Sequence, residues 1–294
     1  MTISATSSRA AESIEDHLAK PSLNVVIAVS DMAATKKFYG EVLGLAPLPP
    51  IQFGETTDPV FFPGGAKMER FRVGRHEIKF IPGVETTRKH PGGVATGIGL
   101  RLVNYPIADI AALLQRLADH GYPAPQIHEL PNSNYRFGLL EDPEGNQVEF
   151  FYYDGEGPKG WQESLHLALT VSDVEASRKF YGQVLGLKEL PSMPLPTDPT
   201  RQVYFFQCGP TLIKFWSFGS DLPNRAGRHL EAYGYRYIQY FTRDVAKAHE
   251  FVRSRGGTID LPPTPVGSMP ASIMFVADPD GVINEMFGVT FGGG

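Results

Sequence analysis

The sequence predicts an α+β protein of two tandem modules, each containing two strand–helix–three-strand (βαβββ) units. The first observation is an internal repeat, in which residues 23–49 and 165–191 are identical at 15 of 27 positions with a constant offset of 142. The second is an Asp-Pro-acidic-Gly segment that occurs at 142–150 and again at 278–286. The third is composition, because 31 glycines and 25 prolines indicate many turns between short strands. A length of 294 residues also suits two domains of about 150 residues each.

The repeats divide the chain into four parts. We expect a mobile N-terminal tail (1–22), a first module (23–153), a linker (154–164) and a second module (165–294). The tail is polar and charged, and a short helix over Ala10–Ala19 is the alternative to a mobile segment. The linker is rich in glycine and charged residues, as flexible connections often are.

Charge and cysteine content narrow the classes of protein. A net charge of −5 argues against a nucleic-acid-binding surface, and no apolar run approaches the roughly 18 residues that would span a membrane. With Cys208 as the one cysteine, no intramolecular disulfide can form, so we expect a reducing, cytoplasmic location. A weak organellar presequence is the alternative, which the three acidic residues of the tail oppose.

Each unit should begin with an apolar strand that leads into a helix. A Ser-Asp pair precedes two of the helices and suits their N-caps, and a glycine follows each helix where a left-handed exit is needed. β-branched or aromatic runs separated by Gly, Pro and Asn then predict three further strands per unit. The four strand and helix pairs are Leu23–Val29 with Asp31–Leu43, Ile98–Val103 with Ile107–His120, Leu165–Val171 with Asp173–Leu185, and Tyr235–Thr242 with Asp244–Arg255.

Two motifs carry a resemblance to a known family. The V-S-D-x-x-x-[ST]-x-K-F-Y-x-x-V-L-G-L segment and the D-P-[DE]-G-x-x-x-E segment, each present twice, resemble the vicinal oxygen chelate superfamily. That superfamily includes glyoxalase I, bleomycin-resistance proteins and extradiol dioxygenases, and the resemblance covers about 23–153 and 165–290. It implies that each module is a pair of βαβββ motifs forming an open β-barrel, or bowl. It also implies a divalent metal held by the opening and closing strands of each half.

The second module carries the better set of candidate ligands. Strand alternation separates His166 from the aliphatic face of Leu165–Val171, so we expect this side chain to point into the bowl. The resemblance makes His166 and Glu285 metal ligands. It places Lys214 where a glyoxalase carries a carboxylate, and Tyr237 where a histidine is expected.

The first module offers no ligand set. Its four matching positions are Asn24, Lys79, a glycine within Gly97–Gly99, and Glu149. An amide and a lysine are poor ligands for a transition metal. We therefore expect this module to be structural or to form an interface.

Our first functional hypothesis is a metal-dependent lyase, isomerase or ring-cleaving dioxygenase that works from the second module. His166 and Glu285 would hold one Fe, Mn, Ni or Zn ion, which binds adjacent oxygens of a small substrate. Tyr237 would complete the metal shell or act in catalysis, and His229 is an alternative ligand from a nearby loop.

Two metal-free alternatives remain open. In the first, a bleomycin-resistance-like protein binds a small hydrophobic molecule, Lys214 neutralises Glu285, and aromatic residues line the pocket. In the second, a metal-free enzyme uses Lys214 as base or electrophile, with its pKa lowered by burial. The residues assigned to the substrate pocket are Trp216, Phe287 and Gln239. We expect a small molecule as the partner, no nucleic acid or membrane, and a monomer or homodimer.

Overall fold

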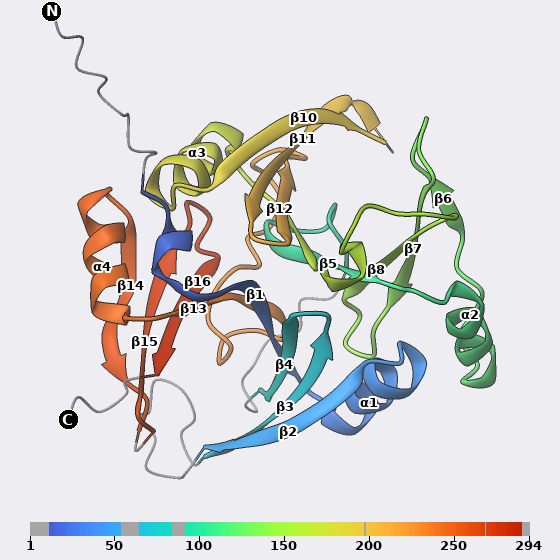
Figure 1. Cartoon of the computed structure of the whole chain (residues 1–294), viewed down its shortest axis with the longest axis horizontal. Coiled ribbons are helices and arrows are strands. Elements are labelled where there is room, and N and C mark those ends of the chain that lie inside the picture. Colours follow the sequence, from blue (N-terminus) through green and yellow to red (C-terminus); the bar gives the residue numbers. More distant parts are fainter. Residues whose placement is uncertain (1–11, 54–64, 84–91, 197, 268, 290–294) are drawn as a thin grey trace, which may run out of the picture.

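Two curled eight-stranded sheets make up the molecule, and short helices lie around their outside (Figure 1). This computed structural model describes residues 12–53, 65–83, 92–196, 198–267 and 269–289. Each sheet contains two βαβββ units, so the predicted architecture of paired units in two open barrels is confirmed.

Barrel 1 joins the first four strands of the chain to the last four, in the order β14-β15-β16-β13-β1-β4-β3-β2. The two groups meet where β1 runs antiparallel to β13. The early strands are β1 (Leu18–Val29), β2 (Ala46–Phe53), β3 (Ala66–Val73) and β4 (His76–Pro82). The late strands are β13 (Gly234–Thr242), β14 (Thr258–Pro265), β15 (Ala271–Ala277) and β16 (Ile283–Val289).

Barrel 2 is made of the eight strands in the middle of the chain, in the order β10-β11-β12-β9-β5-β8-β7-β6. Here β5 runs antiparallel to β9 at the junction of the two units. The first unit contributes β5 (Gly99–Pro106), β6 (Ile127–Glu129), β7 (Tyr135–Glu141) and β8 (Gln147–Tyr153). The second contributes β9 (His166–Thr170), β10 (Lys188–Leu195), β11 (Asp198–Cys208) and β12 (Thr211–Trp216).

The units pair across the modules, and this differs from the expectation that each module closes its own bowl. Barrel 1 takes its first unit from residues 23–153 and its second from 165–294, and barrel 2 takes one unit from each as well. Figure 1 shows the dark blue strand β1 of the N-terminal unit beside the orange strand β13 of the C-terminal unit. Both pairings bury the same strand faces, so the hydrophobic pattern alone does not distinguish them.

Strand alternation separates the core from the barrel interiors. On β1, Val25 and Ile27 belong to the main hydrophobic core, whereas Val26 and Ala28 face the interior of barrel 1. On β9 the predicted aliphatic face also joins the main core, and Ala168 faces the interior of barrel 2. The polar residues at alternate positions of these strands are thereby directed into the two interiors.

The four predicted helices are present in the described residues but are shorter than expected. In the first and third, the α-helix passes into a π-helical turn, in which Leu43 N–H donates to the Phe38 carbonyl at 2.8 Å. None of the described helices has the length and apolar character needed to cross a bilayer. The helices are α1 (Met32–Lys36, then the π-turn Lys37–Val42), α2 (Ile110–Asp119), α3 (Val174–Lys179, then Phe180–Val184) and α4 (Val245–Ser254).

Aspartates cap all four α-helices. The Asp31 carboxylate accepts from the Ala34 N–H at 2.9 Å, and Asp173 caps α3 in the same way. The neighbouring serines have another role, since Ser30 donates to Glu144 and Ser172 donates to Asp280. These contacts join the start of each module to the turn of its Asp-Pro-acidic-Gly segment.

The two repeated motifs contact each other within each module. The Tyr39 hydroxyl of the first Phe-Tyr pair donates to Asp142 at 3.0 Å, and Tyr181 donates to Asp278 at 3.2 Å. Both aspartates also accept backbone N–H groups of their own turns. The motifs that identify the fold therefore hold each module together, while the strands pair between modules.

The described part of the N-terminal segment packs on the protein, which corrects the expectation of a mobile tail or a helix over Ala10–Ala19. After residues 1–11, which lie outside the described residues, a 3₁₀ turn spans Ile14–His17 and β1 begins at Leu18. The Ile14 side chain is fully buried, and its N–H donates to the Leu185 carbonyl at 2.8 Å. Apolar side chains at 14 and 18 explain why this stretch adds to the core.

Candidate functional site

Each barrel encloses a pocket of about 350 Å³, and the sequence-predicted site residues are divided between them. Glu285, Tyr237, Gln239 and Phe287 line the pocket of barrel 1. His166, Lys214 and Trp216 line the pocket of barrel 2. The structure therefore does not bring His166 to Glu285, or Lys214 to Glu285, because the strands that carry them belong to different sheets.

The floor of barrel 1 is set by strand register. Asn24 on β1 lies opposite Gln239 on β13, and Gln239 lies beside Glu285 on β16. Lys79 on β4 pairs with Val26, which is two residues after Asn24 on β1 and therefore on the same face. Gln239 rather than Tyr237 thus occupies the place beside Glu285 that the alignment assigned to Tyr237. The alignment found the correct strand face but was displaced by two residues.

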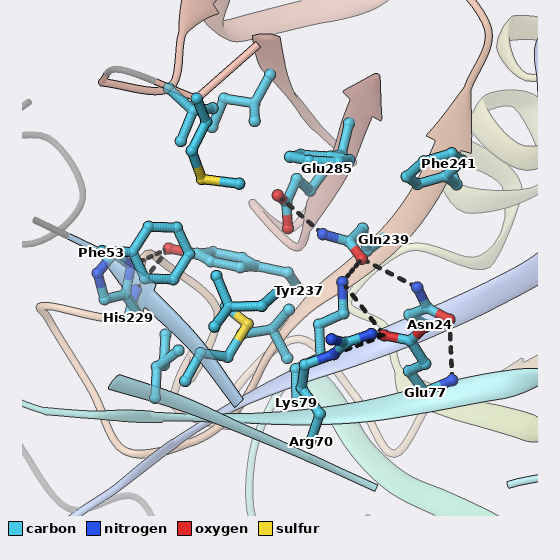
Figure 2. A pocket seen from close by; sticks show the side chains of 18 of the residues that line it. Asn24, Phe53, Arg70, Glu77, Lys79, His229, Tyr237, Gln239, Phe241 and Glu285 are labelled. Atoms are coloured by element: carbon cyan, nitrogen blue, oxygen red, sulfur yellow. Dashed lines mark hydrogen bonds and ion pairs between the residues drawn. The ribbon is translucent and has the colours of Figure 1, made fainter. Parts of the chain in front are cut away.

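A hydrogen-bonded chain crosses this floor (Figure 2). The Gln239 Oε1 atom accepts from Lys79 Nζ at 2.5 Å and from Asn24 Nδ2 at 3.0 Å. Its Nε2 donates to Glu285 Oε1 at 3.1 Å. The other Glu285 carboxylate oxygen has no hydrogen-bond partner among the described residues, and Glu285 lines the pocket. One acceptor is therefore available to a molecule in the pocket.

Burial shifts the pKa values of Lys79 and Glu285 in opposite directions, so that both charged forms become less favourable. Desolvation lowers the pKa of Lys79 to about 8, opposed by the nearby carboxylates of Glu77 and Glu285. Desolvation raises the pKa of Glu285, opposed by Lys79 and by the Gln239 hydrogen bond. A raised pKa makes the Glu285 carboxylate a stronger base, and a lowered pKa makes the Lys79 ammonium a stronger acid, which suits both groups to proton transfer.

Charged side chains at the rim give the pocket of barrel 1 a positive balance. Lys20 and Arg70 join Lys79 as cations, against the carboxylates of Glu77 and Glu285. Glu77 is shared by all three cations, at 2.9 Å from Arg70, 3.8 Å from Lys79 and 3.9 Å from Lys20. The excess of cations favours entry of an anionic molecule.

Tyr237 and His229 form the far wall of this pocket. The Tyr237 hydroxyl accepts from the backbone N–H of His229 at 2.9 Å and contacts the Nδ1 atom of the same residue (Figure 2). Burial raises the pKa of Tyr237, so the phenol stays protonated at neutral pH. His229 thus lines the pocket, as its loop position allowed, but it is tied to Tyr237. Apolar residues such as Phe53, Met68 and Ile273 complete the wall.

The floor of barrel 2 carries a different set at the equivalent positions. Asn104 on β5 lies opposite His166 on β9 and beside Glu149 on β8. Lys214 Nζ lies 3.4 Å from Glu149 Oε1. Burial lowers the pKa of His166 to about 3, so the ring is neutral, and its Nδ1 accepts the Leu212 N–H at 3.2 Å.

The residues at these positions do not fit a divalent metal. In both barrels a lysine ammonium, which has no lone pair, occupies one of the four places, and an amide occupies another. Among the described residues no group of three or more His, Cys, Asp and Glu side chains could hold a metal ion. Catalytic zinc sites typically use three such ligands, and each floor supplies fewer.

Sequence reasoning missed the importance of Lys79 and Asn104. The signal for Lys79 was the shared Ile-Lys-Phe triplet, which showed a lysine at the same position of both modules. Only the cross-module pairing reveals that Lys79, rather than Lys214, shares a pocket with Glu285. Asn104 follows Ile98–Val103 and carried no motif.

Comparison with known proteins supports the fold. Over residues 16–150 and 164–286, the sequence matches the family described as the Glyoxalase/Bleomycin resistance protein/Dioxygenase superfamily. Glyoxalase I from Zea mays has a TM-score of 0.63 at 20% identity, with 92% of this chain and 93% of that chain covered. At this identity the likeness concerns the fold alone.

Two curated relatives share sequence with part of the chain. A lactoylglutathione lyase from Arabidopsis thaliana is 31% identical over 126 residues, which are 42% of this chain and 42% of that protein. A lactoylglutathione lyase from Haemophilus influenzae is 31% identical over 121 residues, which are 40% of this chain and 85% of that protein. The chain therefore spans less than half the length of the Arabidopsis relative that it matches.

Proposed function

The chain belongs to the glyoxalase/bleomycin resistance protein/dioxygenase superfamily, and from this premise we propose that barrel 1 removes a proton next to a carbonyl group of a small anionic substrate. A divalent metal is the cofactor that this family implies in general, but the four floor positions do not fit one. The observation that carries the proposal is the arrangement of Lys79 and Glu285, which line one pocket and are joined through Gln239.

Lys79 supplies the positive charge of the site. Its ammonium donates to Gln239 and has its ion pair with Glu77 at the longer distance of 3.8 Å. A substrate carbonyl oxygen can take a further N–H of the ammonium. In a buried site, such a donor stabilises the negative charge that develops on that oxygen more strongly than water does.

Glu285 supplies the base. The electron pair of the broken C–H bond moves toward the carbonyl carbon, the carbonyl oxygen becomes an enolate beside Lys79, and the proton passes to the free oxygen of Glu285. The hydrogen bond from Gln239 holds the other carboxylate oxygen in place. Return of the proton to a neighbouring atom completes an isomerase reaction, and loss of a leaving group completes a lyase reaction.

Lactoylglutathione is the first compound to test. The two curated relatives are named as lyases of this compound, which carries a hydroxyl next to a thioester carbonyl and a negative net charge. Its acyl end has the adjacent oxygens that Lys79 and Glu285 can address. Lys20 and Arg70, the cations at the rim, can attract the negatively charged glutathione part of the same compound.

The test is deuterium exchange in chelator-treated protein. Lactoylglutathione and related 2-hydroxy carbonyl compounds are incubated in D₂O, and loss of the C–H proton is followed by NMR. We expect exchange in the presence of chelator, its loss in Glu285→Gln, and a decrease of at least tenfold in Lys79→Met. Lys67→Met, a lysine on the outside of the same barrel, is the matched control and keeps the wild-type rate.

Three other results would contradict the assignment of proton transfer to Lys79 and Glu285. Exchange that requires added metal contradicts the role of Lys79. Exchange lost in Lys214→Met but kept in Lys79→Met moves the reaction to barrel 2, as the sequence-based alternative holds. If the compounds bind saturably but none of them exchanges its C–H proton, the protein is a binding protein rather than an enzyme.

A further inference from the structure

The pocket of barrel 2 is walled by aromatic side chains. Tyr135, Phe137, Phe205 and Trp216 line it, together with aliphatic residues such as Leu102. Its volume of about 350 Å³ is at the lower end of the roughly 300–1,000 Å³ range of ligand pockets. A flat aromatic molecule matches walls of this kind, because ring stacking and apolar burial both contribute.

The floor of this pocket contains a buried amide without a partner. Asn104 is fully buried, and neither its Nδ2 nor its Oδ1 atom is hydrogen-bonded to a described residue. The register places Asn104 between His166 and Glu149, which both line the pocket, so its side chain lies on the pocket face. An unpaired buried polar group is destabilising, and such groups occur where function requires them.

A second unpaired donor lies on the wall. Trp216 lines the pocket, and its indole Nε1–H is buried without a hydrogen-bond partner among the described residues. Tryptophan N–H groups normally find an acceptor when they are buried. Two buried side chains of barrel 2, Asn104 and Trp216, therefore have polar atoms without a hydrogen-bond partner among the described residues.

The charges of the floor cancel, unlike those of barrel 1. Lys214 pairs with Glu149, and His166 is neutral. The Nζ to Oε1 distance of 3.4 Å is longer than the roughly 2.7–2.9 Å of a strong charged hydrogen bond. The pair is therefore loose. A molecule with one donor and one acceptor can enter between Lys214 and Glu149 without adding charge.

From these observations we propose that barrel 2 is a second binding site, for a small uncharged aromatic molecule with an amide or lactam edge. The ligand carbonyl accepts from Lys214, and the ligand N–H donates to Glu149. Asn104 lies between His166 and Glu149 in the register, so the ligand amide also supplies the hydrogen-bond partner that this buried side chain lacks. The ring stacks against Trp216 and the other aromatic residues of the wall.

This site is independent of the proton-transfer function proposed for barrel 1. Neither ring nitrogen of His166 can act as a base. Nδ1 already accepts the Leu212 N–H, and in the neutral ring the proton is therefore on Nε2. In the proposed complex Glu149 accepts the ligand N–H, so its carboxylate is occupied as a hydrogen-bond acceptor. The site binds and does not catalyse, so its test measures binding and stability rather than turnover.

The experiment compares 2-naphthamide with 2-naphthoate by isothermal titration calorimetry on the full chain. These probes have the same ring and differ in charge. We expect one molecule of 2-naphthamide to bind barrel 2, and Asn104→Leu to weaken that binding at least tenfold. The same substitution raises the melting temperature of the unliganded protein, because it replaces an unpaired amide by an apolar group of similar size.

A second variant guards against indirect effects. Val203→Phe adds volume inside the pocket without touching the polar floor, and we expect it to abolish 2-naphthamide binding. The proposal is overturned if 2-naphthamide does not bind, if Asn104→Leu lowers the melting temperature and leaves binding unchanged, or if binding is lost in Lys79→Met instead. The last outcome places the probe in barrel 1. A failure of the exchange reaction in barrel 1 changes none of these results.

Discussion

Replacing Lys79 by methionine should stabilise the unliganded protein at neutral pH. Lys79 is buried, and desolvation lowers its pKa from 10.5 to about 8 in the folded chain. This difference corresponds to about 3 kcal/mol of unfavourable free energy for keeping the ammonium charged in the folded state. Loss of the Lys79 hydrogen bond to Gln239 lowers the stability of the variant by about 1 kcal/mol. We therefore expect Lys79→Met to raise the free energy of unfolding by about 2 kcal/mol near pH 7.

The sign of the pH dependence follows from the same pKa. Because the folded pKa is below the unfolded one, the wild-type penalty is fully present below about pH 8 and disappears as the pH rises from about 8 to 10.5. The advantage of Lys79→Met should shrink over this interval. Glu285 takes up a proton more readily in the variant, since burial already raises its pKa and Lys79 no longer opposes this.

Urea unfolding at two pH values is the assay. Wild type, Lys79→Met and the surface control Lys67→Met are compared near pH 7 and near pH 10. A Lys79→Met variant that is less stable than wild type at the lower pH refutes the reasoning, and so does an advantage that is equal at both pH values. Lys67, which is more than half exposed, should give little change at either pH.

Three further predictions concern the motif contacts, the N-terminal segment and ligand charge. Tyr181→Phe should cost about 1–3 kcal/mol in urea unfolding, because it leaves the buried Asp278 with one hydrogen bond fewer; an unchanged midpoint would contradict the structural role of the motif. Ile14→Ala should cost about 2–5 kcal/mol, since Ile14 is fully buried, whereas a mobile segment would show no loss. The affinity of barrel 1 for the anionic lactoylglutathione should fall as the pH rises above about 8, when Lys79 loses its proton, and calorimetry should find this decrease absent in Lys79→Met.

The fold could be predicted from the sequence to a large extent. The aspartate caps and the left-handed glycines that follow the helices depend on local chemistry, and the structure shows both. The direction of His166 into a barrel followed from alternation. These features are local, so neighbouring residues along the chain determine them.

The site could be predicted only in part, because it depends on which units pair. Strands β1 and β9 have equivalent faces, so the sequence does not show that β1 joins β13 rather than β5. That choice separates Glu285 from His166 and joins it to Lys79. The two-residue displacement between Tyr237 and Gln239 likewise needed the observed register.

Metal content tests the central claim most directly, namely that the cation on the floor of barrel 1 is Lys79. The full chain is purified without chelator, equilibrated with Fe, Mn, Ni and Zn in turn, and analysed by mass spectrometry beside Glu285→Gln. The account predicts far less than one metal per chain and no difference between the two proteins. Near-stoichiometric metal that disappears in Glu285→Gln would contradict it.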